Sequence, residues 1–423
     1  MNKKLNRKRI ADGIYFSTYN DTRFQKNRIE IRFIDTLDSE SASLNAIVPA
    51  IISRSNNQYK TMKELNLKLS ELYSAEICDY VSKIGDVSEF GLYSYSLSSK
   101  FAYDGENVLE EIAVILRDCL FDPYLENGVF PESVVELQKQ NLIDANNNEI
   151  NNKAKYASRK AHAKAYENEP ASVRINGENS EIEKITAESA YKQYLKIIET
   201  KHVEIMCIGS EDFSLVEKIF TEAFAKINRH PEQEPKSMWS VIKNDVSEIS
   251  EQMNIEQSKL ILVFKTNYNE WINSSLMSFM FGGDVSSKLF TIVREKLSLC
   301  YYCSSSYSRY KNSMSVTCGV DTKNIEKAKE AILDQLEEIK KGNFTDEDMT
   351  KAKLAIATPL TAVKDFMDSI ASWYFACIDN KELIEPADRI KMYNDVTREK
   401  IIEAANAVKL DTVFVLCPKE ENI

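Results

Sequence analysis

Histidine, glycine and long apolar runs are all scarce in this sequence. Only three of the 423 residues are histidines, His162, His202 and His230, and they are far apart along the chain. Because imidazole is the commonest metal ligand in proteins, this scarcity argues against a metal centre built from several histidines. Glycine occurs only 11 times. The adjacent pair Gly282 and Gly283 is therefore conspicuous.

The apolar and charged residues exclude several classes of protein. No run approaches 18 apolar residues, so we expect no membrane-spanning helix. The basic N-terminus MNKKLNRKRI is not followed by an apolar segment, so we expect no secretory signal and a cytoplasmic location. The net charge of −11 argues against nucleic acid as a partner, because phosphate binding needs a basic surface.

Eight cysteines are spread over the whole chain and do not resemble a disulfide framework. We expect most of them to be buried free thiols in a reducing compartment. Cys300 and Cys303 form a C-x-x-C, but no second pair or nearby histidine completes a zinc site. A redox motif would begin a helix, whereas this pair enters a predicted strand, so we expect neither metal binding nor redox chemistry from it.

Patterns of hydrophobicity predict a chain of mixed strands and helices. A T-x-x-S that starts at Thr186 predicts a capping box at the beginning of one helix. The predicted strands are 28–34, 75–81, 89–101, 203–208, 259–264, 300–306, 313–320 and 412–417. The predicted helices are 44–52, 62–73, 107–119, a helix from 131 to about 146, 186–198, 274–281, 325–340, 345–357 and 397–407, with a further helical stretch beyond Pro359.

The order of these elements repeats along the chain. Matching positions are separated by an offset that falls slowly from 231 to 209 residues. The pairs are Phe33 and Phe264, Asn107 and Asn324, Phe130 and Phe344, and Val203 and Thr412. We therefore predict two similar halves, 1–229 and 241–423, joined by a linker at 230–240 that contains two prolines. Without strict βαβ alternation, the fold class is α+β with mixed, largely antiparallel sheets packed with helices.

The segment from Gly282 to Tyr302 is the most informative in the second half. Its apolar spacing predicts a helix with one buried face, formed by Leu289, Phe290, Ile292, Val293 and Leu297. Arg294 and Tyr301 are the polar-headed side chains that could reach out of it. The alternative is structural, with Arg294 paired to Glu295 and Tyr301 filling a core position.

This segment reads G-G-x-x-x-S-x-L-F-x-x-V-R-E-K-x-x-L-x-Y and resembles the insulinase-like (M16) metallopeptidase family, in its small bacterial branch. The resemblance extends through both halves and implies a LuxS/M16 metallopeptidase-like fold. In that family this part of the second half binds the substrate backbone near the scissile bond. The resemblance thus implies substrate-binding roles for Arg294, Tyr301, Gly282 and Gly283.

The catalytic signature of the family, H-x-x-E-H, is missing from this chain. Alignment places it on residues 46–50 or 45–49, which contain neither His nor Glu, and Pro49 would interrupt the helix. The later Glu ligand would fall on Ala145, and a slip of one residue offers only Asp144. We therefore expect no catalytic residue and no metal on this chain.

The resemblance implies that this chain is the non-catalytic subunit of a heteromeric M16-type zinc peptidase, with the zinc on an H-x-x-E-H paralogue and a peptide as substrate. The chain is most similar to a zinc-less branch associated with 5-aminopentanol modification of elongation factor P. An alternative is a pseudoenzyme scaffold in that modification pathway, without proteolysis. Another is a self-sufficient metallopeptidase with unusual ligands. In isolation a homodimer is also possible.

Overall fold

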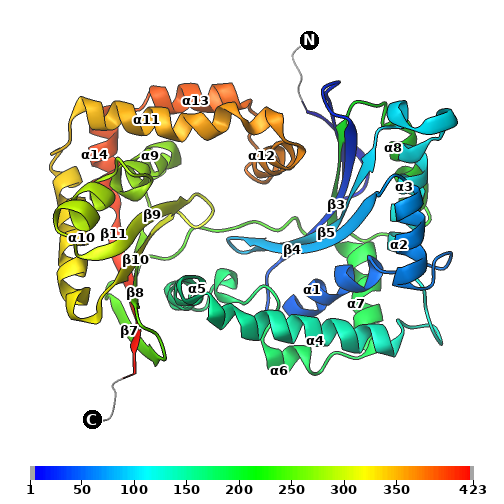
Figure 1. Cartoon of the computed structure of the whole chain (residues 1–423), viewed down its shortest axis with the longest axis horizontal. Helices are drawn as coiled ribbons and strands as arrows, with labels where there is room; N and C mark the ends of the chain where they lie inside the picture. The colour runs from blue at the N-terminus through cyan, green and yellow to red at the C-terminus, as the bar shows by residue number, and fades with distance from the viewer. Residues whose placement is uncertain (1–4, 420–423) are drawn as a thin grey trace. The chain divides into compact units, whose positions relative to one another are not determined.

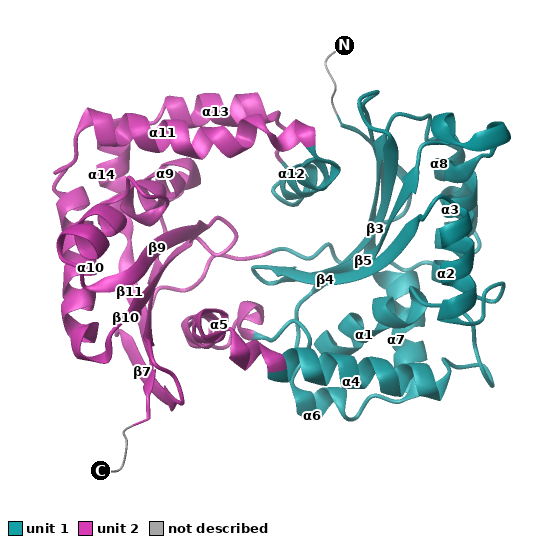
Figure 2. Ribbon diagram, in the orientation of Figure 1, with its two compact units in different colours: residues 1–147, 173–236, 366–381 teal, residues 148–172, 237–365, 382–423 magenta. Residues whose placement is uncertain are grey.

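The computed structural model describes residues 5–419, which divide into two compact units (Figure 2). Unit 1 comprises the residues up to 147 together with 173–236 and 366–381. Unit 2 comprises residues 148–172 and 237–365 and the chain from 382 onward. Each unit is built on one β-sheet with helices on both faces (Figure 1).

Unit 1 contains a six-stranded sheet in the order β1-β2-β6-β3-β5-β4. Only β2 and β6 run parallel, and every other neighbouring pair is antiparallel. The strands are β1 (Asn6–Ala11), β2 (Ile14–Asn20), β3 (Lys26–Thr36), β4 (Glu76–Ile84), β5 (Val87–Leu97) and β6 (His202–Gly209).

The central strand β3 is buried on both of its faces. Side chains alternate along a strand, so Ile29, Ile31 and Phe33 enter the main apolar core with helices of unit 1. Arg28 and Arg32 point to the opposite face, where both pair with acidic residues of helix α12. Apolar and charged residues therefore alternate in RIEIRFI because one face of the strand enters the apolar core and the other carries ion pairs with α12.

The helices of unit 1 fall into two groups by the face they cover. Helices α1, α3, α7 and α8 contribute to the main core, whereas α12 packs on Tyr19, Met206 and Ile208 on the other face. The helices are α1 (Ala42–Ile52), α2 (Met62–Glu71), α3 (Val108–Phe121), α4 (Glu132–Asn148), α6 (Asn179–Ile182), α7 (Ala187–Thr200), α8 (Ser214–Phe224) and α12 (Met367–Asp379), with short 3₁₀ turns at Ser99–Phe101 and Tyr103–Gly105.

Helix α1 corrects one expectation from the sequence. It runs without a break from Ala42 to Ile52 and includes Pro49, so the prediction that Pro49 interrupts it is wrong. Proline removes one backbone hydrogen bond from a helix interior. Almost every residue of α1 is buried, among them Ile47 and Ile51. We infer that burial of this apolar surface outweighs the lost bond.

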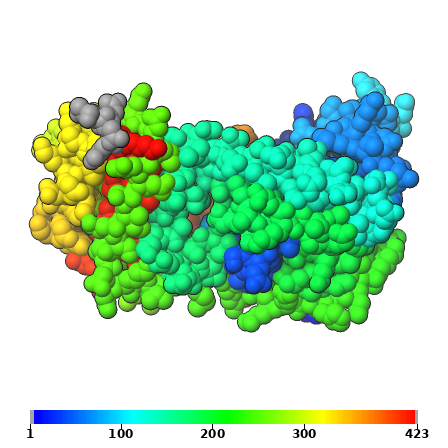
Figure 3. Space-filling model, turned by 90° about the horizontal axis from the view of Figure 1, so that it is seen from below, coloured from blue at the N-terminus to red at the C-terminus, as the bar shows by residue number. Residues whose placement is uncertain are grey.

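Unit 2 contains a five-stranded sheet in the order β7-β11-β8-β10-β9. Strand β7 at the edge runs parallel to β11, and the two lie side by side on the surface in Figure 3, in green and red. The remaining pairs are antiparallel. The strands are β7 (Ser247–Met253), β8 (Ser258–Lys265), β9 (Cys300–Ser308), β10 (Ser313–Val320) and β11 (Lys409–Pro418).

The two faces of this sheet are again covered differently. Most helices of unit 2 form the main core on one face, whereas α5 packs Ala157, Ala161 and Ala165 on Ile261 and Val263 of the other face. The helices are α5 (Lys153–Ala165), α9 (Trp271–Gly282), the π-helix η5 (Leu289–Lys296), α10 (Ile325–Lys340), α11 (Asp346–Thr361), α13 (Pro386–Asn394) and α14 (Arg398–Ala407), with 3₁₀ turns at Glu149–Asn151, Pro170–Ser172, Thr322–Asn324 and Val363–Asp365.

The two sheets share one topology, with β6-β3-β5-β4 in the first corresponding to β11-β8-β10-β9 in the second. The predicted α+β class with mixed, largely antiparallel sheets in two similar halves is confirmed. The compact units do not follow the predicted boundaries 1–229 and 241–423, because each takes one helix from the other half of the sequence. Helix α5 lies in unit 2 and α12 in unit 1, while residues 230–240 contain neither helix nor strand.

Strands β1, β2 and β7 and helix α8 were not predicted from the sequence. Strand β7 alternates half-buried and exposed residues at a sheet edge, so it lacks the apolar run that marks the central strands. Within residues 5–419, no helix is both long enough and apolar enough to cross a membrane.

Candidate substrate-binding segment

The glycine pair lies at the end of α9, where the helix meets β9. A Cβ atom on Gly282 would lie 2.5 Å from the backbone nitrogen of Ser305 and 2.8 Å from a methyl carbon of Leu289. A Cβ atom on Gly283 would lie 2.5 Å from the ring of Phe279. Both contacts are too close for any side chain. The structure therefore gives Gly282 a packing role that fixes β9 against α9, and its predicted role toward substrate stays a prediction.

The predicted amphipathic helix is a π-helix. In η5 the backbone nitrogen of Leu297 donates to the carbonyl of Ile292 at 2.8 Å, five residues back. Only Leu289 and Val293 of the five predicted apolar positions are buried, and Leu297 is exposed. The prediction of a five-residue buried face is therefore too broad. Wide turns of this kind are rare and often occur at functional sites.

Arg294 extends from η5 with 39% of its side chain exposed. Its guanidinium carbon lies 4.4 Å from the centre of the Phe290 ring, and Nε lies 3.6 Å from a carboxylate oxygen of the adjacent Glu295. An exposed ion pair of this length contributes at most about 1 kcal/mol. The alternative pairing of Arg294 with Glu295 is therefore confirmed, and a contact with the Phe290 ring also holds the guanidinium. Its predicted role toward substrate stays a prediction.

Tyr301 is exposed because of a bulge in β9. In the pairing of β9 with β10, Tyr302 lies opposite Gly319 while Cys300 lies opposite Val320. Tyr301 is the extra residue between them, and 58% of it is exposed. Bulges commonly redirect a side chain beside an active site. The alternative that Tyr301 fills a core position is therefore wrong.

The Tyr301 hydroxyl has one hydrogen-bond partner, Asp321 at the end of β10, to which it donates over 3.1 Å. This bond raises the pKa of the Tyr301 phenol above its ordinary value. The hydroxyl therefore stays protonated at neutral pH and keeps its donor. Sequence analysis did not identify Asp321, because only the strand pairing brings it to Tyr301.

The Cys300 thiol connects the two predicted residues. Hydrogen bonds from Cys303 and Cys318, and then the positive charge of Arg294, lower the pKa of Cys300 below its ordinary value. The positive charge of Arg294 thus acts on the residue that precedes Tyr301. One predicted donor lies on η5 and the other at the beginning of β9.

The positions of the missing zinc signature lie in the interior of unit 1. Residues 46–50 of α1 are buried and offer only apolar side chains. Asn45 is also buried, where it donates to Asp35 at 2.9 Å and accepts from Gln193 at 2.6 Å. Lys201 pairs with the same Asp35 at 2.7 Å. A lysine cation and amide groups satisfy this polar cluster, and its residues do not fit a zinc ion.

The remaining residues considered as ligands are scattered. On α4, Ala145 and Asp144 are exposed, and Asp144 accepts a hydrogen bond from Gln140. The Nε2 atom of His162 lies 2.7 Å from Ser315 Oγ in unit 2, and that of His202 lies 2.8 Å from a backbone oxygen in unit 1. Within residues 5–419, Cys300, Cys303 and Cys318 form the only group of three or more residues spaced to hold a metal ion.

Comparisons with known proteins support the predicted resemblance. Residues 184–356 match the family described as "Peptidase M16 inactive domain". The chain is 24% identical over 404 residues to "Probable inactive metalloprotease YmfF" of Bacillus subtilis (strain 168), and the match covers 93% of each chain.

Two crystal structures share the fold. A conserved protein from Enterococcus faecalis V583 superposes with a TM-score of 0.92 at 23% identity, over 99% of this chain and all of that one. A protein from Pseudomonas fluorescens described as a peptidase M16 inactive domain superposes with a TM-score of 0.80 at 17% identity, over 99% of both chains. The predicted resemblance to M16 peptidases is confirmed, and both the matched family and the Bacillus subtilis relative are described as inactive.

Proposed function

Because residues 184–356 match the M16 inactive-domain family, we propose that this chain is the non-catalytic subunit of a two-chain zinc peptidase. In this proposal Arg294 and Tyr301 bind the substrate backbone at a metal held by the partner. The observation that carries the proposal is the state of these two residues: both are exposed donors on ordered elements, in a chain without the family's zinc ligands.

The chemistry of the two donors suits a peptide. A guanidinium offers several N–H groups and a protonated phenol offers one O–H group, and each can bind a carbonyl oxygen or a developing oxyanion. Such donors accelerate a reaction only where a nucleophile is generated nearby. Since residues 45–50 lack the histidines and the glutamate of the family's signature, we place the metal-bound water on the partner.

The proposed partner is an M16 paralogue with an intact H-x-x-E-H, the proposed location is the cytoplasm, and the substrate is a peptide or an unfolded protein segment. A connection with the 5-aminopentanol modification of elongation factor P is part of the proposal only through the sequence resemblance. In isolation, two copies of the chain could form a homodimer through the surface that otherwise meets the paralogue.

The proposal is tested by mixing the purified chain with its H-x-x-E-H paralogue and measuring cleavage of a quenched fluorescent peptide library. We expect cleavage by the mixture and none by this chain alone. Loss of one oxyanion donor typically lowers kcat by about 10²–10³-fold, so we expect a fall of that order for Arg294→Ala. Tyr301→Phe removes only the hydroxyl and should lower kcat in the same direction.

Lys296→Ala is the matched control, because Lys296 is an exposed cation on the same π-helix. It should leave cleavage unchanged. If Arg294→Ala and Tyr301→Phe cleave the peptides as fast as the control Lys296→Ala, the proposed role of Arg294 and Tyr301 is refuted. A stable complex of the two wild-type chains that cleaves no peptide would instead support the pseudoenzyme scaffold, in which the chain binds a peptide or a modification enzyme.

A further inference from the structure

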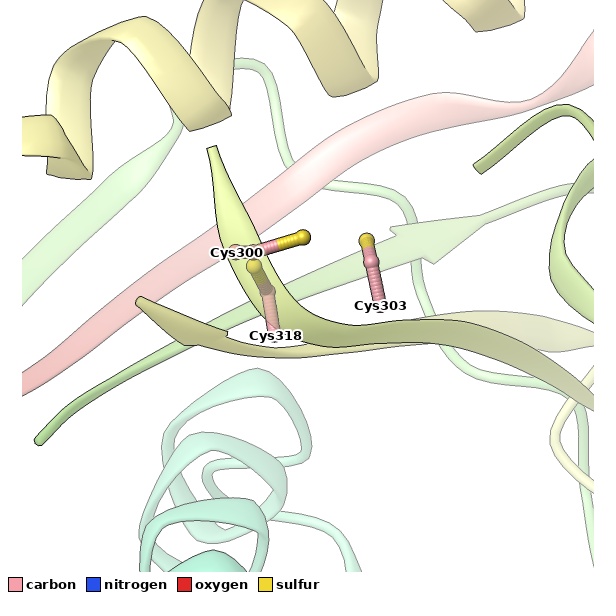
Figure 4. A group of neighbouring side chains, drawn as sticks. All are labelled: Cys300, Cys303 and Cys318. Atoms are coloured by element: carbon pink, nitrogen blue, oxygen red, sulfur yellow. The ribbon is translucent and has the colours of Figure 1, made fainter. Parts of the chain in front are cut away.

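Three cysteines of strands β9 and β10 lie close together, next to Tyr301 in the chain. The sulfur atoms of Cys300, Cys303 and Cys318 all lie within 4.8 Å of one another. Figure 4 shows the three side chains directed into one space beside strands β9 and β10. Cys318 is fully buried and Cys303 nearly so, whereas Cys300 is half-buried.

The bulge in β9 explains how a C-x-x-C can place both of its thiols on one face of a strand. Residues three apart on a regular strand point to opposite faces. The extra residue Tyr301 shifts this alternation, so that Cys300 joins Cys303 on the face directed to the core. Cys318 lies directly opposite Cys303 on β10 and therefore shares that face. The same bulge exposes Tyr301 and assembles the thiols.

We propose that Cys300, Cys303 and Cys318 form a binding site for one soft, thiolate-seeking metal ion, with copper(I) as the preferred ion. Thiolate sulfur selects copper(I) and zinc among the available cations. Around one ion with metal–sulfur bonds of about 2.3 Å, three coplanar sulfur atoms lie about 4 Å apart. The observed spacing needs only small side-chain rotations to reach that arrangement.

The composition of the ligand set decides between the two ions. Structural zinc sites almost always have four protein ligands. No histidine or carboxylate of residues 5–419 joins the three thiols. Three thiolates without a fourth protein ligand suit copper(I), whose lower charge tolerates fewer ligands.

The site is independent of the proposed peptidase role, because it uses residues that the role does not need. It also differs from the family's catalytic zinc site, since it lies on the second sheet rather than on α1. Cys300 is the least buried of the three cysteines. A bound ion would tie β9 to β10 at the bulge, and so would hold the backbone on both sides of Tyr301.

The test is an anaerobic titration of the reduced, chelator-treated full-length chain with copper(I) in competition with bicinchoninate. We expect one copper(I) per chain and a higher Tm in its presence. Cys300→Ser should lower the affinity at least tenfold. It is the preferred variant because Cys300 is only half-buried, so its replacement should leave the fold intact by circular dichroism. Cys318→Ser should abolish tight binding.

Cys417→Ser is the matched control, since Cys417 is a half-buried thiol in β11 of the same sheet but outside the cluster. It should bind copper(I) as the wild type does. Equal affinities for Cys300→Ser and Cys417→Ser would overturn the proposal, as would the absence of stoichiometric binding by the wild type. A higher affinity for zinc than for copper(I), measured with a chromophoric zinc chelator, would show that copper(I) is not the preferred ion.

Discussion

Replacement of Arg32 should strongly destabilise unit 1. Its side chain is 2% exposed and forms ion pairs with both Glu89 of β5 and Asp379 of α12. The distance to Asp379 is 2.9 Å. Its guanidinium carbon also lies 4.6 Å from the centre of the Phe375 ring. Arg32→Met keeps the length of the side chain but leaves two carboxylates, 8% and 15% exposed, without their cation.

The cost follows from those buried charges. Breaking a buried ion pair by removing one partner costs about 3–5 kcal/mol, and the lost aromatic contact adds about 1 kcal/mol. We therefore expect Arg32→Met to lower the free energy of unfolding by about 4–6 kcal/mol at neutral pH. Since the contact to Asp379 holds α12, hydrogen exchange of α12 should rise more than that of α7.

The loss should also depend on pH. Burial raises the pKa of Asp379 above its ordinary value, and Arg32 opposes that rise. Without Arg32 the folded-state pKa rises further above the unfolded value. A carboxyl group with a raised folded-state pKa favours the fold at low pH, and that contribution is lost as pH rises through the raised pKa. The variant should therefore lose less stability at pH 5 than at pH 8.

Urea unfolding at both pH values measures these differences. Asp379→Asn is the matched comparison, because it removes one carboxylate while Arg32 keeps Glu89. It should cost less than Arg32→Met. A loss below about 1 kcal/mol for Arg32→Met, the value typical of a surface ion pair, would refute this account. So would a loss that is the same at pH 5 and pH 8.

Three further substitutions test local features. Gly282→Ala would force a Cβ atom to 2.5 Å from the backbone of Ser305, and should cost about 1–3 kcal/mol, measured by urea unfolding. Thr186→Ala removes the capping box with Ser189 at the start of α7, and should cost about 1 kcal/mol, measured as a lower Tm. Leu276→Ala in the fully buried core of unit 2 should cost about 2–5 kcal/mol in the same unfolding assay.

Each of these substitutions has an outcome that would contradict its reasoning. Unchanged stability of Gly282→Ala would show that α9 and β9 have room for a methyl group. For the cap, Thr186→Ser retains the hydroxyl oxygen and should behave as the wild type, so an equal loss in both variants would exclude capping as the cause. A cost below 1 kcal/mol for Leu276→Ala would mean that its site collapses around the smaller side chain.

Periodic hydrophobicity was enough to predict most elements of the fold. Strand β3 was recognised from apolar residues that alternate with charged ones, and helix α7 was recognised together with its capping-box motif. The repeat of elements predicted two similar halves, and the two sheets share one topology. The exchange of α5 and α12 could not be predicted. Their apolar faces show that each packs on a sheet, but not which of the two sheets it covers.

The candidate site was predictable where it depends on local sequence. Arg294 and Tyr301 lie in one continuous motif and both side chains are exposed, but their role toward substrate stays a prediction. The cysteine cluster was missed for two reasons. The bulge that turns Cys300 to the same face as Cys303 leaves no mark in the residue pattern, and Cys318 is brought to them only by strand pairing across β9 and β10.

The reciprocal exchange of α5 and α12 makes the two halves of the sequence inseparable. A fragment ending in the linker at 230–240 would leave Tyr19 and Ile208 uncovered in its sheet, and the complementary fragment would leave Ile261 and Phe414 uncovered. Neither piece would be a self-sufficient folding unit. A chain nicked in the linker would nevertheless stay together without a covalent bond, since each piece completes the core of the other. Two genes encoding the halves would have to be expressed together to yield the protein.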